Sequence, residues 1–398
     1  MNNKWIKSYS YLIIWITLFF MYSCGAKKDA SLKKILHPSD NARIVHSQYE
    51  PKTVFNSDIK NLFDLDSLLD VESAYYAIKN YQDDEYVAVD VVDADVNGSE
   101  NLLYLVDKKL GKVNAFDLSG DYRFSIGRKG RGPGEFILPS ALARVNNHLL
   151  VLDKSFKVES FKATNGEHHK SYQLGYSPLD ICAIGTSIFV YGFSFDNGDI
   201  PEDKLVHKYE MTTNGELIYS NSFGDLYPGN SQMISSALSV GKLECLESTG
   251  DILLVNQWFP FVSLFDKNGN QKIKFRFEDY SQRRIEEIIS QGQTVSYTVN
   301  RAESKVHNFI DIKRDELSQT FLLQYTFGAD QTNETTLKKI VESTEYYTVE
   351  INPIRKSAKL VSMDKNFPLL FVSKNFVLSL KMDFKKKEPN IVIYERKK

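Results

Sequence analysis

One acidic stretch has a spacing that could bind a cation. Asp93-Ala94-Asp95-Val96-Asn97-Gly98 places oxygen ligands at alternate positions, as at the start of a calcium-binding loop. The bidentate acid expected at the twelfth position of such a loop would fall on Tyr104, so the match fails there. Asn-Gly between two strand-like runs is a common hairpin signal. We therefore interpret this stretch as a turn between strands and predict no metal site.

Histidines and nucleophile motifs give no catalytic set. The seven histidines are scattered, and His168-His169 is the only close pair. Adjacent residues in an extended chain point to opposite faces, which suits joint metal ligation poorly. The chain has no Gly-x-Ser-x-Gly elbow and no Cys-x-x-Cys pair, and no spacing of carboxylates singles out an acid/base couple. We predict no catalytic residue and no cofactor.

Basic side chains lie in a glycine-rich stretch between Gly127 and Phe136. Arg128, Lys129 and Arg131 could supply positive charge to a phosphate-binding loop. The stretch lacks the Gly-Lys-Ser/Thr ending of such loops, and no helix is predicted after it. Phosphate binding is therefore the minor alternative here, although these three residues stay candidates for ligand contacts.

Cys24 follows a segment typical of exported proteins. Two lysines precede an apolar run, Tyr11–Tyr22, which is short for a bilayer span of roughly 20 residues and fits a signal peptide. Met21-Tyr22-Ser23-Cys24-Gly25-Ala26 resembles a bacterial lipobox, which implies cleavage before Cys24 and lipidation of that cysteine. An ordinary secretory signal or an uncut membrane anchor is the alternative.

These features predict three segments. We expect a lipoprotein signal peptide over residues 1–23, a lipidated cysteine and flexible tether over 24–42, and one folded domain over 43–398. Lipidation would place the protein in the outer membrane of the cell envelope. No run of acids follows Cys24, which favours the periplasmic face over the cell exterior.

Two cysteines remain if Cys24 is acylated. Cys182 and Cys245 lie in separate strand-like segments, in a compartment that permits disulfides. Free cysteine behaves as a small core hydrophobe. We expect two buried free thiols, with a disulfide as the alternative.

Composition favours strands and disfavours polyanion binding. The chain has 25 Phe and 22 Tyr, residues that pack well on a pleated sheet. Its 49 basic and 51 acidic groups leave a net charge of −2, so no overall field attracts nucleic acid. We expect no nucleic-acid partner and a monomeric protein.

A repeat of about fifty residues organises the chain. Two strand-like runs followed by a glycine turn recur, and the turn glycines fall at Gly120, Gly166, Gly215 and Gly269. A second series, Gly127, Gly175 and Gly224, has a similar period. Units of four short strands at this spacing are typical of propeller blades, each of which buries its faces against its neighbours.

The fold expected is an all-β propeller of six four-stranded blades. A short helical insertion is predicted near 281–291, with Ser281 as its cap and Gly292 as its stop. A terminal strand commonly closes such a ring. Residues 390–394 and residues 42–45 are both candidates for that strand, and the sequence does not choose between them.

The glycine-rich stretch also carries a family resemblance. Residues 124–136, Phe-Ser-Ile-Gly-Arg-Lys-Gly-Arg-Gly-Pro-Gly-Glu-Phe, resemble the blade-crossing loop of six-bladed β-propeller lipoproteins and, more distantly, of NHL-repeat propellers. The resemblance implies an exported propeller, often beside nutrient-uptake systems, and brings no catalytic residues. Glycine tolerates the sharp crossing between blades, proline stiffens it and phenylalanine fills the gap. The residues assigned to this crossing are Gly127, Gly130, Gly132, Pro133, Gly134 and Phe136.

The function expected is binding rather than catalysis. We expect a lipid-anchored binding or scaffold module for a glycan, a peptide or an envelope protein. Trp258 and Phe259, at an expected hairpin turn, are candidate ligand contacts, with packing between blades as the alternative. The competing hypothesis is a carbohydrate-active enzyme, a lyase or hydrolase, with its site in the central channel. Fold alone does not decide between them.

Overall fold

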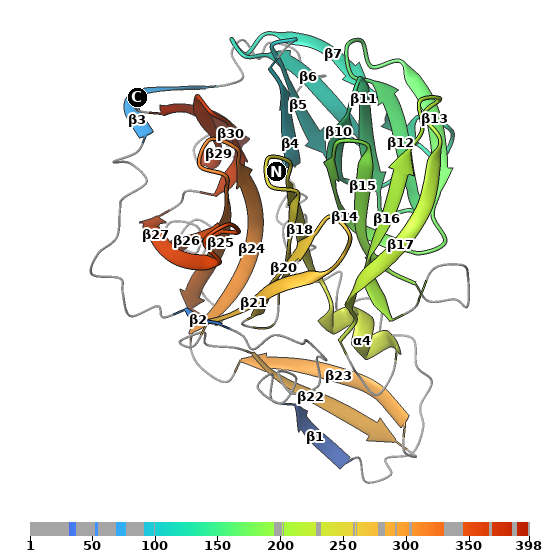
Figure 1. Cartoon of the computed structure of the whole chain (residues 1–398), viewed down its shortest axis with the longest axis vertical. Coiled ribbons are helices and arrows are strands. Elements are labelled where there is room, and N and C mark those ends of the chain that lie inside the picture. Colours follow the sequence, from blue (N-terminus) through green and yellow to red (C-terminus); the bar gives the residue numbers. More distant parts are fainter. Residues whose placement is uncertain are drawn as a thin grey trace, which may run out of the picture.

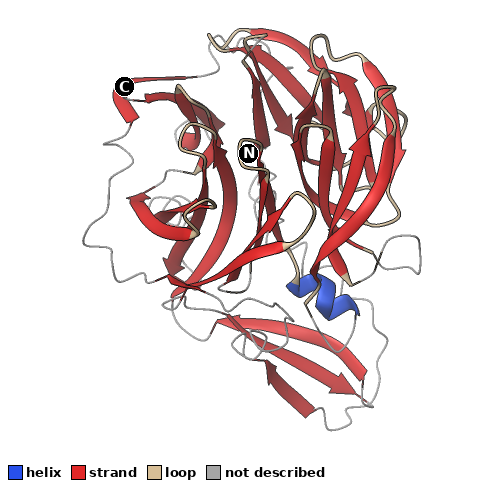
Figure 2. Ribbon diagram, in the orientation of Figure 1, coloured by secondary structure: helices blue, strands red, loops and turns tan. Residues whose placement is uncertain are grey.

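Six four-stranded blades form the protein. The computed structural model describes residues 32–36, 52–54 and 69–76, and residues 91–396 with gaps. Almost all described elements are strands (Figure 2). They form eight sheets, and six of these are blades arranged around a central axis (Figure 1). The predicted six-bladed propeller is confirmed.

Each of the first three blades is a simple antiparallel meander whose first strand lies at the axis. Blade 1 contains β4 (Val91–Asn97), β5 (Leu102–Asp107), β6 (Lys112–Asp117) and β7 (Tyr122–Ile126). Blade 2 contains β10 (Pro139–Val145), β11 (His148–Asp153), β12 (Lys157–Lys162) and β13 (His168–Gln173). Blade 3 contains β14 (Ser177–Ile184), β15 (Ser187–Phe193), β16 (Lys204–Met211) and β17 (Leu217–Asp225).

Blades 4 and 5 continue the pattern. Blade 4 contains β18 (Gly241–Leu246), β19 (Asp251–Asn256), β20 (Phe261–Asp266) and β21 (Gln271–Phe277), and β2 (Lys52–Val54) pairs parallel to its outer edge. Blade 5 contains β24 (Lys305–Asp315), β25 (Thr320–Ala329), β26 (Glu345–Asn352) and β27 (Ser357–Lys365).

Blade 6 closes the ring with strands from both ends of the chain. It contains β28 (Leu369–Val372), β29 (Phe376–Asp383), β30 (Glu388–Arg396) and β3 (Leu69–Tyr76). β3 pairs antiparallel with β30, and β28 lies beside β4 of blade 1. Of the two closure candidates, residues 390–394 lie in β30 and residues 42–45 lie outside the described part of the chain.

The core consists of apolar layers between consecutive blades. One layer joins blades 1 and 2 through Tyr104, Phe136 and Phe161, and another joins blades 4 and 5 through Phe275, Phe321 and Tyr325. Each of the other four interfaces has its own buried cluster. A single blade has no apolar partner of its own, so the ring is what buries the strands.

The helix predicted near residues 281–291 is wrong. Arg283–Ser290 forms β22, which pairs with β23 (Gln293–Arg301) on one side and β1 (Leu32–Leu36) on the other. Its isoleucines lie at helical spacing, but their β-branched side chains favour a strand once a partner strand is available. In the described part of the chain the helix is instead α4 (Gln232–Leu238), between blades 3 and 4.

The prediction of two free thiols is also wrong. Cys182 of β14 and Cys245 of β18 form a disulfide, with their Cα atoms 5.5 Å apart. The innermost strands of neighbouring blades lie side by side, which brings these two positions within bonding distance. Both cysteines are buried, and the bond joins blades 3 and 4 close to the axis.

Candidate functional site

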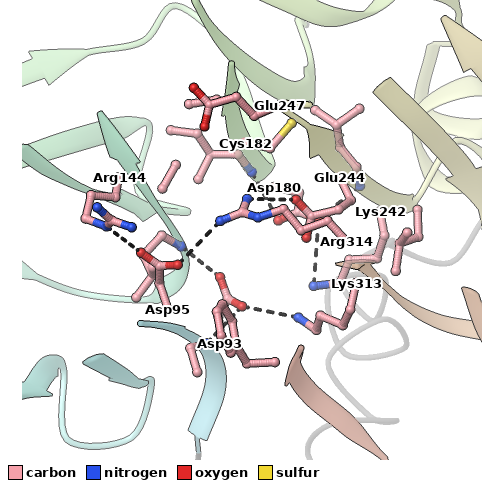
Figure 3. Close-up of a pocket in the computed structure, with 18 of the residues that line it drawn as sticks. Asp93, Asp95, Arg144, Asp180, Cys182, Lys242, Glu244, Glu247, Lys313 and Arg314 are labelled. Atoms are coloured by element: carbon pink, nitrogen blue, oxygen red, sulfur yellow. Dashed lines mark hydrogen bonds and ion pairs between the residues drawn. The ribbon is translucent and has the colours of Figure 1, made fainter. Parts of the chain in front are cut away.

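A cavity of about 220 Å³ lies on the axis, where the innermost strands of all six blades converge (Figure 3). Its wall is predominantly polar, unlike the layers between the blades. The charged residues that line it are Asp93, Asp95, Arg144, Asp180, Lys242, Glu244, Glu247, Asp311, Lys313 and Arg314. They come from blades 1 to 5, while blade 6 contributes Phe371 and Val372.

A bulge within the inner strand positions the aspartates of this wall. The pairing register shifts just before Asp93 in β4, Asp180 in β14 and Asp311 in β24. Such a bulge re-aims the residue that follows it. Lys242 occupies the matching position in β18, where the register has no shift. The same structural position on the ring therefore carries three acids and one base.

These aspartates also hold the strands together. Asp93 accepts a hydrogen bond from the Leu142 backbone N–H of blade 2 (2.9 Å), and Asp180 accepts one from the Leu243 N–H of blade 4 (3.0 Å). Each of them also accepts a bond from the N–H of the residue that follows it, as Asp311 does from Ile312. Much of their acceptor capacity is thus used by the fold.

Arg314 connects three blades across the cavity. Its guanidinium lies 3.4 Å from Asp95 of blade 1 and 3.2 Å from Glu244 of blade 4 (Figure 3). Asp95 has a second partner, the Arg144 guanidinium of blade 2, at 3.1 Å. Arg314 and Asp95 are therefore each shared between two partners, which compensates part of the cost of burying their charges.

Two lysines complete the network. The Lys313 ammonium lies 3.0 Å from Asp311 and 3.4 Å from Asp93. Lys242 is more loosely placed, with 3.9 Å between its ammonium and the Asp180 carboxylate. Although burial alone would lower the pKa of Lys313, the neighbouring carboxylates raise it, so Lys313 is a permanent cation.

Glu244 is a cavity residue whose carboxyl group has a pKa near neutrality. Burial raises its pKa to about 7, and the attraction of Arg314 and Lys313 offsets only part of that effect. Burial also raises the pKa of Asp180. The pKa of Asp311 is lowered, because Lys313 and Lys242 outweigh its burial. A carboxyl group that titrates near neutrality can exchange protons with a ligand.

The basic candidates of the glycine-rich stretch lie away from this cavity. Arg128 is exposed and forms an ion pair with Glu135 of the same loop at 2.8 Å. Lys129 and Arg131 are exposed on that loop. None of the three is among the residues lining the described cavity.

The glycine-rich stretch joins β7 of blade 1 to β10 of blade 2. β8 (Arg128–Lys129) pairs parallel with β9 (Glu135–Phe136), and Gly130, Gly132 and Pro133 lie between these two short strands. Phe136 is fully buried against Phe161. A buried Lys157–Glu159 ion pair holds the loop, because Lys157 donates to the carbonyl of Glu135 and Glu159 accepts from the N–H of Gly134.

The aromatic candidates do not form a described binding surface. Trp258 lies outside the described residues. Phe259 is only 5% exposed and stacks on Tyr227, with 5.0 Å between ring centroids. Its ring is packed in the interior, which is the alternative that the sequence left open.

Comparison with known proteins places the chain in a family. A family model described as DUF5128, a 6-bladed beta-propeller, matches residues 45–310. The chain belongs to this family. No curated protein matches the sequence.

Two solved structures share the propeller fold of this DUF5128 protein. A Bacteroides fragilis NCTC 9343 protein, described as a candidate exported protein, has a TM-score of 0.53 and 14% identity, and the match covers 88% of this chain and all of the other. A member of the DUF4221 family from Bacteroides vulgatus ATCC 8482 has a TM-score of 0.52 and 10% identity, with 81% and 95% covered. At such identities the likeness concerns the fold.

Two further observations concern the described residues alone. No three His, Cys, Asp or Glu side chains among them are arranged to hold a metal ion. No helix among them has the length and apolar character needed to cross a bilayer.

Sequence reasoning missed the residues of the axial cavity. A signal for them exists, because an aspartate between two apolar residues recurs in three inner strands, as Val92-Asp93-Ala94, Leu179-Asp180-Ile181 and Ile310-Asp311-Ile312. A charge inside an otherwise apolar inner strand marks the side chain that faces the axis. Asp93 and Asp95, considered for a calcium loop, instead belong to β4 and line the cavity.

Proposed function

We propose that this protein is an exported, lipid-anchored binding module whose axial cavity receives a small polar ligand, or the polar end of a glycan, a peptide or a partner protein. The observation that carries this proposal is the cavity wall, in which five blades contribute charged side chains of both signs. Because these charges line an open cavity, a polar ligand can reach them and exchange hydrogen bonds with them.

The size of the cavity limits what can enter. Sites for drug-sized molecules span roughly 300–1,000 Å³. A volume of about 220 Å³ is smaller and suits one sugar unit or one amino-acid unit. A longer glycan or peptide would therefore insert only its terminal unit.

Anchoring through Cys24 would hold the cavity near a membrane. We place the protein in the outer membrane of the cell envelope, on the periplasmic face, and the lipobox-like sequence supports the anchor. Seven residues, 25–31, separate Cys24 from β1. Even fully extended, such a segment spans at most about 25 Å. The anchored cavity would receive a ligand delivered to, or taken from, an envelope uptake system.

An enzyme remains the second candidate, and one observation favours it. Glu244 has a pKa of about 7 and lies in the cavity beside Arg314. A carboxyl group of this kind could serve as the proton donor of a lyase or hydrolase. The carboxylates of Asp93, Asp95 and Asp180 are engaged by backbone N–H groups or ion pairs, which leaves these three poorly placed for a second catalytic role.

Calorimetry with the detergent-purified protein tests the proposal. Sugars, sugar acids, amino acids and short peptides are titrated into the wild type, Glu244→Gln and the control Glu395→Gln, which changes an exposed glutamate of β30. We expect one class to bind the wild type and the control, and to bind Glu244→Gln more weakly. Product formation that Glu244→Gln abolishes while binding persists would favour the enzyme. No binding by any class would overturn the proposal.

A further inference from the structure

A loop and two turns meet at one end of the propeller. Val91 pairs with Asp107 and Pro139 pairs with Asp153, so the turns after β5 and β11 lie where the inner strands of their blades begin. The loop that leads from β7 into β10 reaches the same end. Three segments over blades 1 and 2 therefore share this end of the axis, namely residues 108–112, 128–136 and 154–157.

Direct contacts hold these three segments against one another. Gly111 lies so close to Lys129 that a Cβ added to the glycine would come within 3.1 Å of the lysine Cβ. On the other side, the Lys157 ammonium donates hydrogen bonds to the carbonyls of Gly132 and Glu135. The loop is thus fixed between a turn of blade 1 and a turn of blade 2, and the three segments form one surface.

This surface is strongly basic. The three segments contain eight lysines and arginines and one acidic residue, Glu135, which pairs with Arg128 at 2.8 Å. Lys109, Lys129 and Arg131 are exposed. Among the residues that the structure describes, none forms an ion pair with Lys129 or Arg131. A local excess of positive charge attracts an anionic partner even though the net charge of the chain is close to zero.

An aromatic side chain protrudes beside these charges. Phe156 is 47% exposed, and its φ is 69°. Bulky residues rarely adopt this conformation, and blade 1 has Gly111, with a φ of 64°, at the matching place before its third strand. Phenylalanine at this turn therefore costs stability through backbone strain and leaves an apolar ring in water. These two costs are typical of a residue that contacts a partner.

The expected anchor is attached to this same end. Seven residues separate Cys24 from β1, and β1 pairs with β22 in the connection between blades 4 and 5. That connection leaves β21 and enters β24 at the end where the inner strands begin. Lipidation of Cys24 would therefore bring the basic end of the propeller towards the bilayer.

The axial cavity opens at the other end. The exposed residues among those that line it are Asn146, Gly185 and Glu247. Each lies in the turn that follows an inner strand, β10, β14 or β18, and so at the end opposite to the basic surface. A membrane at the basic end would leave the cavity accessible from the aqueous side.

We propose that Lys109, Lys129, Arg131 and Phe156, the basic face, dock on an anionic bilayer and orient the propeller with its cavity towards the aqueous side. Anionic headgroups attract the basic side chains, and an aromatic ring inserts at the boundary between headgroups and acyl chains. This inference rests on the proposed anchor, which brings the face to a membrane, and adds a docking surface and an orientation. Each charge contributes only about fivefold to binding, so docking orients the anchored protein and does not replace the anchor.

Fluorescence from introduced tryptophans tests the docking. The detergent-purified protein is reconstituted through its anchor into vesicles of phosphatidylcholine, with or without phosphatidylglycerol, whose brominated acyl chains quench tryptophan. Phe156→Trp reports on the basic face. Leu317→Trp is the matched control, because Leu317 is 55% exposed in the turn after β24, at the end where the cavity opens. The wild type supplies the background from its own tryptophans.

We expect Phe156→Trp to be quenched in the anionic vesicles alone, and Leu317→Trp to be quenched in neither. Adding Lys129→Gln and Arg131→Gln to Phe156→Trp should weaken docking about fivefold for each charge removed. Adding Lys267→Gln, which changes an exposed lysine between β20 and β21, should leave docking unchanged. Phe156→Asn should melt at or above the wild-type temperature, because asparagine tolerates a positive φ.

Several outcomes would overturn the basic face. They are equal quenching of Phe156→Trp and Leu317→Trp, quenching that needs no anionic lipid, and quenching that survives loss of Lys129 and Arg131. A response of Phe156→Trp to polyglutamate but to no vesicle would identify an acidic protein partner and rule out the membrane. A lower melting temperature for Phe156→Asn would make Phe156 a packing residue.

These outcomes differ from those that test the proposed function. Protein that does not stay on neutral vesicles would refute the anchor, and quenching of Phe156→Trp by added anionic vesicles would then still support the basic face. Protein that stays on the vesicles with Phe156→Trp unquenched would refute the basic face and leave the anchor standing. Ligand binding in the axial cavity is measured separately by calorimetry and depends on neither result.

Discussion

Arg314 and Asp95 form an ion pair across the propeller axis, with 3.4 Å between Nη2 and Oδ1 although 219 positions separate them in the sequence. One residue belongs to blade 5 and the other to blade 1, which are not neighbours on the ring. The charge network therefore ties together blades whose apolar faces never meet.

Arg314→Gln should weaken the folded state. The substitution leaves the buried Asp95 with one cation instead of two and removes the closest partner of Glu244. We expect the free energy of unfolding to fall by about 2 kcal/mol, measured by urea denaturation. Arg355→Gln, which changes an exposed arginine after β26, is the control. Equal stability of the two variants would show that the network contributes nothing.

Glu244 should make stability depend on pH. Its pKa of about 7 in the folded protein exceeds the ordinary 4.5, so the folded state holds its proton more tightly than the unfolded state does. The contribution of Glu244 to stability is complete below pH 4.5 and is lost as the pH rises through about 7. Across this window the stability of the wild type relative to Glu244→Gln should fall by at most roughly 3 kcal/mol. Parallel pH profiles in urea denaturation would contradict the shift.

The disulfide should stabilise the ring. Cys182 and Cys245 are 63 positions apart, and a cross-link of that length restricts the unfolded chain. Replacing both with alanine should lower the free energy of unfolding by about 2–4 kcal/mol, measured under oxidising conditions. Thiol titration of the denatured, unreduced protein should find neither cysteine free. Two reactive thiols at these positions would refute the bond.

Gly127→Ala should be far more harmful than Gly175→Ala. Gly127 has a φ of 68°, and an added Cβ would lie 2.3 Å from the buried Phe136 ring. Gly175 holds the corresponding place after blade 2, and its Cβ would meet nothing within 4 Å. We expect a loss of about 2 kcal/mol or more for Gly127→Ala and less than about 1 kcal/mol for Gly175→Ala. Matching thermal melts of the two variants would show that the crossing tolerates a side chain.

Cys24→Ser should release the protein from membranes. Several acyl chains make an anchor effectively permanent, whereas the serine variant has no acceptor thiol. Fractionation of cells and labelling with a fatty-acid analogue measure the difference. Membrane association that survives in Cys24→Ser, without label in the wild type, would point to an uncut anchor instead.

The propeller fold could be predicted from the sequence because the turns within its blades require glycine. Gly120, Gly166, Gly215 and Gly269 all have positive φ at the turn before the outer strand of their blades. Residues other than glycine rarely adopt that conformation, so a glycine recurs at this turn in each of these blades. The spacing of these glycines therefore reveals the length of the repeat.

The cavity was not readable in the same way. Its wall combines single residues from strands far apart in the chain, and each residue looks like an isolated charge within an apolar run. The disulfide could not be predicted for a related reason, because it depends on which strands of neighbouring blades lie in contact. The strand at Arg283–Ser290 was mistaken for a helix because helical spacing of isoleucines does not reveal a pairing partner.

The pairing of β3 with β30 sets an order of assembly. Blades 1 to 5 can form as their residues emerge, but the last sheet needs Leu69–Tyr76 and Glu388–Arg396 together. Until then two apolar blade faces stay open, and such faces promote aggregation. A truncated product that ends before Glu388 should therefore be retained by chaperones or degraded. During synthesis, Leu69–Tyr76 has no partner strand in this sheet until nearly the whole polypeptide has been made.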